Sequence, residues 1–168
     1  NPYSLKTLIR HIATDQRAVI FPEGRITVTG SLMKIYPGPG LVAEKSRAVL
    51  LPVRIDGAQF TPFSRLRGRV RLRWLPKITL TILPPQWLTI PDAARGRERR
   101  RIAGKQLADV MTEMMFTTSN YRQTLFGALL DARRVHGGGH VIVEDIERQP
   151  LTYNQLLLRA TMLGDLIA

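Results

Sequence analysis

The sequence predicts an α/β protein, and two features carry this prediction. Short apolar runs that end at proline, glycine or aspartate are typical of buried strands, and they alternate with longer segments whose apolar residues recur at helical spacing. Apolar residues make up 44% of the chain and charged residues 23%. That composition is typical of a globular protein with a core and excludes a wholly disordered chain.

The first half of the chain opens with a predicted helix over residues 4–13, whose serine can act as N-cap. The apolar run 18–21 stops at a proline and predicts a buried strand. Alternating proline and glycine at 37–40 predict a turn, which leads into a short helix over 41–46. A second apolar strand is expected over 48–55, where an Asp-Gly pair ends it.

Further elements are expected from the same two periodicities. Two more strands are separated by a proline, and a long helix follows with its isoleucine, leucine, valine and methionines on one side. Beyond it, a helix, a glycine loop, a short strand and a final helix complete the pattern. The two strands are residues 69–74 and 78–83, and the long helix is 95–117. The later helix, glycine loop, strand and final helix are 121–135, 136–140, 141–143 and 154–167.

Charge divides the chain at the same point as the elements do. Residues 1–90 carry 14 Lys/Arg against 4 Asp/Glu, residues 91–118 carry 6 against 4, and residues 119–168 carry 5 against 5. We therefore predict two domains, residues 1–118 and 119–168. The basic first part needs an anionic partner, which can be a phospholipid surface, a nucleic acid or an acidic protein.

Cysteine is absent from the chain, which excludes disulfides, thiolate zinc sites and a cysteine nucleophile. Three histidines without a carboxylate pair at ligand spacing predict no metal site. The chain starts at Asn1 with no signal peptide pattern and ends within an apolar-periodic helix, so we expect it to be part of a longer protein. No uncharged run is long and apolar enough to predict a membrane span.

The strongest chemical signal is the sequence Phe21-Pro22-Glu23-Gly24-Arg25-Ile26-Thr27 at the end of the first expected strand. An arginine can bind a phosphate through two hydrogen bonds, and a carboxylate can accept hydrogen bonds from glycerol hydroxyls. Glycine lets a ligand approach the backbone closely. The alternative is a turn with a solvated Glu–Arg pair.

This block, followed by Leu51-Pro52-Val53, resembles the glycerolipid acyltransferase family (the lysophosphatidate-acyltransferase-like superfamily). The resemblance implies that Phe21, Pro22, Glu23, Gly24 and Arg25 bind the glycerol-phosphate part of the acceptor, with Thr27 at a hydroxyl position. It also implies that Leu51, Pro52 and Val53 lie near the acyl and acceptor site. The family more often continues with Thr-Arg-Ser, so the arginine here stands one position early.

Residues 119–168 are similar to the opening of adenylate-forming (AMP-binding) ligases. The similarity covers the run from Val141 to Glu147, the sequence Pro150-Leu151-Thr152-Tyr153 and the helix after it. The two resemblances together imply a partial acyltransferase sheet flanked by helices, followed by the start of a ligase domain. No cofactor is expected on these residues; ATP and Mg²⁺ belong to the rest of the ligase half.

The implied reaction transfers an acyl group from acyl-acyl-carrier-protein, on its phosphopantetheine thiol, to a lysophospholipid such as 2-acylglycerophosphoethanolamine. The resemblance implies that the fused half is an ATP-dependent fatty acid:acyl-carrier-protein ligase. The family's base is a histidine in an H-x-x-x-x-D block upstream, whereas His11 and Asp15 are one residue too close together. We therefore expect no catalytic residue in this chain, a supporting role for Glu23, and no turnover by these residues alone. The implied location is the cytoplasmic face of a bacterial inner membrane.

Arginines at period two form a second candidate site, which would contact a membrane or the carrier protein. If the segment is a strand, one face carries them all, and the alternative is a solvated polar face. They are Arg65, Arg67, Arg69, Arg71 and Arg73. A different class of function, a basic non-catalytic module that binds nucleic acid or a membrane surface, also fits the charge. Few aromatic residues and no RNA-binding or helix-turn-helix pattern argue against nucleic acid as a partner.

Overall fold

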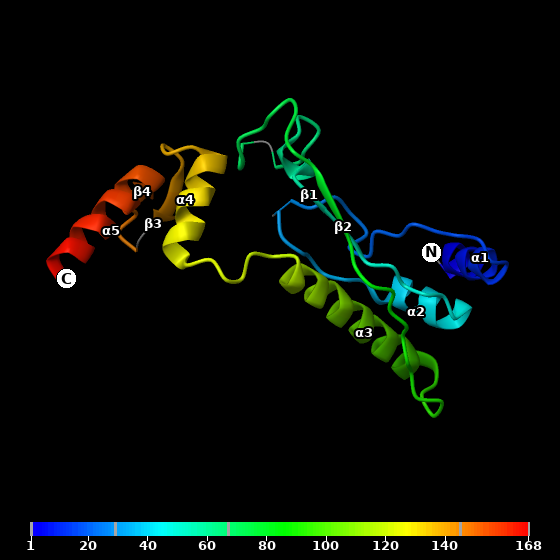
Figure 1. The fold of residues 1–168 in the computed structure, drawn as a ribbon. Helices are drawn as coiled ribbons and strands as arrows, with labels where there is room; N and C mark the ends of the chain where they lie inside the picture. The colour runs from blue at the N-terminus through cyan, green and yellow to red at the C-terminus, as the bar shows by residue number, and fades with distance from the viewer. Residues whose placement is uncertain (1, 29, 67, 145, 168) are drawn as a thin grey trace.

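The computed structural model describes residues 2–28, 30–66, 68–144 and 146–167, and among them it forms a mixed α/β fold of five α-helices and two small antiparallel sheets (Figure 1). The helices are α1 (Pro2–Ala13), α2 (Pro37–Ser46), α3 (Gly96–Thr117), α4 (Leu125–His136) and α5 (Tyr153–Ile167). A short 3-10 turn, η1, covers Ala58–Phe60. The strands are β1 (Val53–Asp56), β2 (Thr79–Ile82), β3 (Val141–Glu144) and β4 (Pro150–Thr152).

Each sheet is a pair of antiparallel strands. β1 pairs with β2 so that Val53 lies opposite Ile82, and an isolated bridge between Leu50 and Gln86 continues the pairing. β3 pairs with β4 in the same sense, with an irregularity after Val141. The general α/β prediction is confirmed, although the strands are arranged in hairpins.

Three of the expected elements are wrong. Residues 18–21 and 69–74 form no strand in the described part of the chain. In the second segment, the Arg69 and Val70 amides both donate to the carbonyl of Leu66, which makes a turn. The predicted turn at 37–40 is instead the start of α2, because a proline at the first helical position has a suitable φ and lacks only an amide that needs no partner there.

The buried core lies where α2 crosses α3. Val42 and Ala103 are fully buried, with Ala43 and Leu107 beside them. The two helix backbones approach closely because Gly40 faces the carbonyl of Ala103, and Gly104 of α3 faces Pro37 in the same way. α1 packs on α2, where the side chain of Leu5 lies near Gly38.

The last part of the chain, α4, β3, β4 and α5, lies together beyond the C-terminal end of α3 (Figure 1). The predicted domain boundary falls in the connection between α3 and α4, and it stays a prediction. Ring contacts link this part to the first: His136 lies against Phe60 at a centroid distance of 6.5 Å, and it stacks on His140 and Tyr153. None of the helices in the described residues is long and apolar enough to cross a bilayer.

Candidate functional site

The Phe-Pro-Glu-Gly block forms a tight turn on an irregular segment. The Gly24 amide donates to the carbonyl of Phe21 at 3.0 Å, and Gly24 has a φ of +66°, which only glycine adopts without strain. The Tyr36 amide donates to the carbonyl of Pro22 at 3.0 Å. The turn is therefore tied to the residue that precedes α2.

Glu23 and Arg25 both face the same residue across this loop. Oε2 of Glu23 accepts a hydrogen bond of 2.9 Å from the Met33 amide, and a guanidinium nitrogen of Arg25 lies 3.6 Å from the Met33 sulfur. Among the described residues, Oε1 of Glu23 accepts no hydrogen bond and Arg25 forms no ion pair. A carboxylate oxygen and a cation are thus held in one loop with capacity to bind a ligand.

Thr27 has a different environment. Its hydroxyl accepts a hydrogen bond of 3.0 Å from the Gly30 amide and donates to the carbonyl of Ser31 at 3.3 Å. These bonds hold the end of the loop, so a ligand at Thr27 would compete with the backbone for the hydroxyl.

The second block lies on the β1–β2 hairpin. Leu51 is exposed, Pro52 is buried, and Val53 begins β1. The carbonyl of Pro52 accepts from the Leu83 amide at 3.0 Å. Pro52 also lines a cavity of about 320 Å³ between the hairpin and α3. The other lining residues are Leu83, Gln86, Asp109, Val110, Glu113 and Met114.

The arginine segment is a loop, so its side chains do not share one face of a strand. Arg65, Arg69, Arg71 and Arg73 are exposed, and Arg67 lies outside the described residues. The guanidinium of Arg69 donates to the carbonyl of Val28 at 2.8 Å. The structure therefore brings the arginine segment against the loop that carries Glu23, which the sequence alone did not predict.

His11 lies on α1, and Asp15 follows that helix. His11 is an exposed residue of α1, and its Nε2 lies 3.4 Å from the carbonyl of Arg17. Asp15 follows the helix in a left-handed conformation, with φ of 61°.

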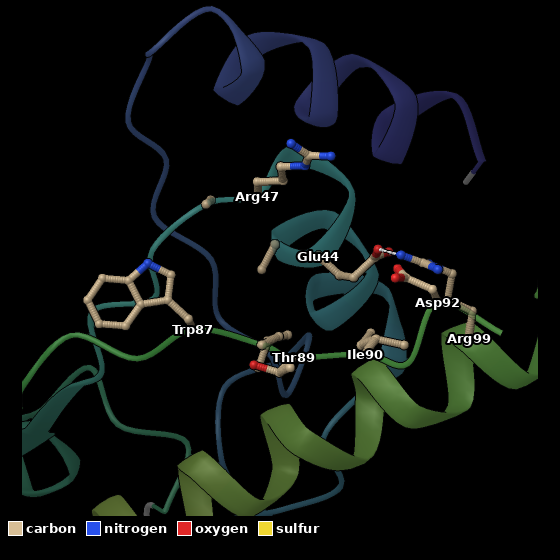
Figure 2. A pocket seen from close by; sticks show the side chains of 10 residues that line it. Glu44, Arg47, Trp87, Thr89, Ile90, Asp92 and Arg99 are labelled. Carbon is tan, nitrogen blue, oxygen red and sulfur yellow. Dashed lines mark hydrogen bonds and ion pairs between the residues drawn. The ribbon is translucent and has the colours of Figure 1, made fainter. Parts of the chain in front are cut away.

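A further cavity of about 300 Å³ was not predicted from the sequence (Figure 2). It lies between the end of α2, the segment 87–92 and α3, and Glu44, Arg47, Trp87, Asp92 and Arg99 are among its lining residues. Figure 2 shows the Glu44 carboxylate directed at the Arg99 guanidinium, with Asp92 close by. Arg47 and Arg99 balance the two acids, so the cavity is polar and carries both signs of charge.

The Glu44–Arg99 pair joins α2 to α3 at the wall of this cavity. Nε of Arg99 donates to Oε1 of Glu44 at 2.8 Å, and the Glu44 side chain is only 8% exposed. The hydrogen bonds to Glu44 raise the pKa of Arg99, and the charges of Glu44 and Asp92 add to the effect, although burial opposes it. The other carboxylate oxygen, Oε2, is buried without a hydrogen-bond partner in the described structure.

No protein-family model matches this chain, and no solved structure matches it. Within the described residues, no three histidine, aspartate or glutamate side chains form a group that could hold a metal ion. The functional proposal therefore rests on the residues of the loop and on the sequence resemblance.

Proposed function

We propose that residues 1–118 are the acceptor-binding part of a glycerophospholipid acyltransferase. The observation that carries the proposal is the hydrogen bond from the Met33 amide to Oε2 of Glu23. It holds the carboxylate in the same loop as Arg25, which contacts the Met33 sulfur, and Oε1 accepts no hydrogen bond among the described residues. In this proposal, Arg25 binds the acceptor phosphate and Oε1 of Glu23 accepts a hydrogen bond from the glycerol part. The turn at Gly24 exposes the backbone to the ligand.

The reaction in this proposal is the attack of the acceptor hydroxyl oxygen on the carbonyl carbon of an acyl thioester. The hydroxyl gives up its proton, the new ester bond forms, and the phosphopantetheine thiol of the acyl carrier protein leaves. Glu23 supports the reaction by orienting the hydroxyl, since its carboxylate is already held by an amide. We assign no general base to the described residues.

The apolar chain of one substrate has a candidate place beside the second block. The cavity that Pro52 lines has an apolar side formed by Leu83, Val110 and Met114, and its remaining wall carries Gln86, Asp109 and Glu113. Burial of acyl methylenes there stabilises binding by about 0.8 kcal/mol each. This arrangement supports the role that the resemblance implies for residues 51–53.

We further propose that residues 119–168 begin an adenylate-forming ligase. Stretches 29–36 and 51–60, together with this second part, resemble a bifunctional bacterial enzyme, the 2-acylglycerophosphoethanolamine acyltransferase joined to an acyl-[acyl-carrier-protein] synthetase. In that reading the partners are a lysophospholipid and acyl carrier protein, at the cytoplasmic face of the inner membrane. ATP and Mg²⁺ would serve the ligase half, and no residue described here is assigned to them.

Calorimetric titration with glycerophosphoethanolamine, the soluble acceptor headgroup, tests the acceptor site. Glu23→Gln keeps an oxygen for the Met33 amide but removes the charge, and Arg25→Gln removes the cation. Since a hydrogen bond to a charged group contributes about 1.5–3 kcal/mol, each change should weaken binding by about tenfold or more. The matched controls Glu147→Gln and Arg159→Gln, at exposed sites elsewhere, should bind as the parent does. Equal binding by all four variants would reject the proposal.

A further inference from the structure

The segment between β1 and β2 projects beyond the end of the hairpin, on the side away from α2 and α3 (Figure 1). Its base is closed, because the Arg73 amide donates to the carbonyl of Phe60 at 2.7 Å and the carbonyl of Lys77 lies against Gly57. Near its centre, the side chain of Leu66 is buried against Gly30. The loop is thus anchored at its base and at Leu66, and the Arg69–Val28 hydrogen bond and the Phe60–His136 ring contact add to this.

Three large apolar side chains of this loop are almost fully exposed. Phe63 is 91% exposed, Trp74 85% and Leu75 96%. Phe63 is three residues from Phe60, and Trp74 directly follows Arg73, so the Phe60–Arg73 hydrogen bond brings both aromatic residues to the same part of the loop. Single exposed apolar residues are common, but this grouping on a projecting loop is typical of an interaction site.

The same segment is strongly cationic. Residues 57–77 contain six Lys/Arg and no Asp/Glu. Arg65, Arg71 and Arg73 are exposed, and none of the ion pairs among the described residues involves them. The loop therefore presents unpaired guanidinium groups beside exposed apolar side chains.

We propose that the loop of residues 57–77 docks on an anionic bilayer, with Phe63, Trp74 and Leu75 entering the interfacial region. Arg65, Arg71 and Arg73 would then bind lipid phosphates. Tryptophan prefers the membrane–water interface, where its ring is in apolar surroundings and its N–H stays hydrated. A nucleic acid would neutralise the arginines but would give Leu75 no apolar surroundings, whereas an anionic bilayer provides both. The loop contacts the segment that carries Glu23 through Leu66 and Arg69. Phe63, Trp74 and Leu75 are exposed, and a test of their insertion does not depend on acceptor binding.

Tryptophan fluorescence tests the insertion directly, because the chain has only two tryptophans. In the full chain carrying Trp87→Phe, Trp74 is the remaining reporter. Vesicles of phosphatidylglycerol and phosphatidylcholine should shift its emission to the blue, and brominated lipids should quench it. Phosphatidylcholine vesicles alone should bind much more weakly, and added salt should weaken the binding to anionic vesicles.

Variants then separate the apolar and cationic contributions. Phe63→Ser with Leu75→Ser should reduce vesicle partitioning by about tenfold or more, while Ile146→Ser, at a 100% exposed site outside the loop, should not. Arg71→Gln and Arg73→Gln should each reduce it about fivefold. Vesicle binding without a change in Trp74 emission, no binding at all, or binding to duplex DNA that displaces the vesicles would each overturn the proposal.

Discussion

The crossing of α2 and α3 predicts that Gly40→Ala destabilises the protein. A methyl group at position 40 would lie 2.8 Å from the carbonyl carbon of Ala103 and 3.2 Å from the amide nitrogen of Gly104. Carbon atoms in good contact are about 3.5–4.0 Å apart, so the two helices would have to separate. The neighbours are backbone atoms and cannot move aside as a side chain could.

The magnitude follows from two opposed effects. Overpacking of a well-packed core costs about 1–3 kcal/mol, and alanine gains up to about 1 kcal/mol over glycine within a helix. The contact with backbone favours the upper part of that cost, so we expect a net loss of about 1–2 kcal/mol. For a chain of this length, the melting temperature should fall by about 2–8 °C.

Thermal and urea unfolding, followed by far-ultraviolet circular dichroism, measure the effect. Gly164→Ala is the matched control, because it lies in α5 and an added Cβ would meet nothing within 4 Å. The control should gain about 0.5–1 kcal/mol from the reduced freedom of the unfolded chain. If Gly40→Ala were as stable as Gly164→Ala, the close contact between α2 and α3 would be refuted.

Two further predictions concern the last part of the chain. Burial lowers the pKa of His136 below its ordinary value of 6.5, and the charge of His140 adds to this. Unfolded protein therefore binds the proton more readily, so the free energy of unfolding should fall as pH drops below about 6.5. His136→Phe should flatten this slope in urea titrations at several pH values. Thr124 caps α4 by accepting from the Gly127 amide at 3.0 Å, so Thr124→Ala should lose about 1 kcal/mol, and a loss no larger than that of Thr124→Ser would count against the cap.

The sequence predicted those elements that are specified by residues within or next to the element itself. The helical spacing of apolar residues placed α1 and α3 correctly, and the prolines at 76, 84 and 85 located the ends of β2. The alternating arginines of 69–74 satisfied the strand pattern equally well, but the Leu66 carbonyl takes two of that segment's amides and no strand forms. The periodicity of side chains does not determine which carbonyl groups accept hydrogen bonds from the backbone amides, so it cannot by itself predict a strand.

For the candidate site too, the sequence predicts the local features but not the contacts between distant residues. The turn at Gly24 is a local feature that the Pro-Glu-Gly sequence indicates. The Glu23–Met33 hydrogen bond and the Arg69–Val28 hydrogen bond join positions 10 and 41 residues apart, so they depend on the fold. The Glu44–Arg99 pair spans 55 residues and had no signal beyond the cluster of cations at the start of α3.

The central claim is that the loop around Glu23 binds a lysophospholipid acceptor. An NMR titration with a short-chain lysophosphatidylethanolamine, below its critical micelle concentration, tests this most directly. We predict that the amide signals of Gly24, Arg25 and Met33 shift with one affinity, that Gly164 does not shift, and that Glu23→Gln weakens the affinity by about tenfold. Shifts confined to other parts of the chain, or unchanged by Glu23→Gln, would contradict the account.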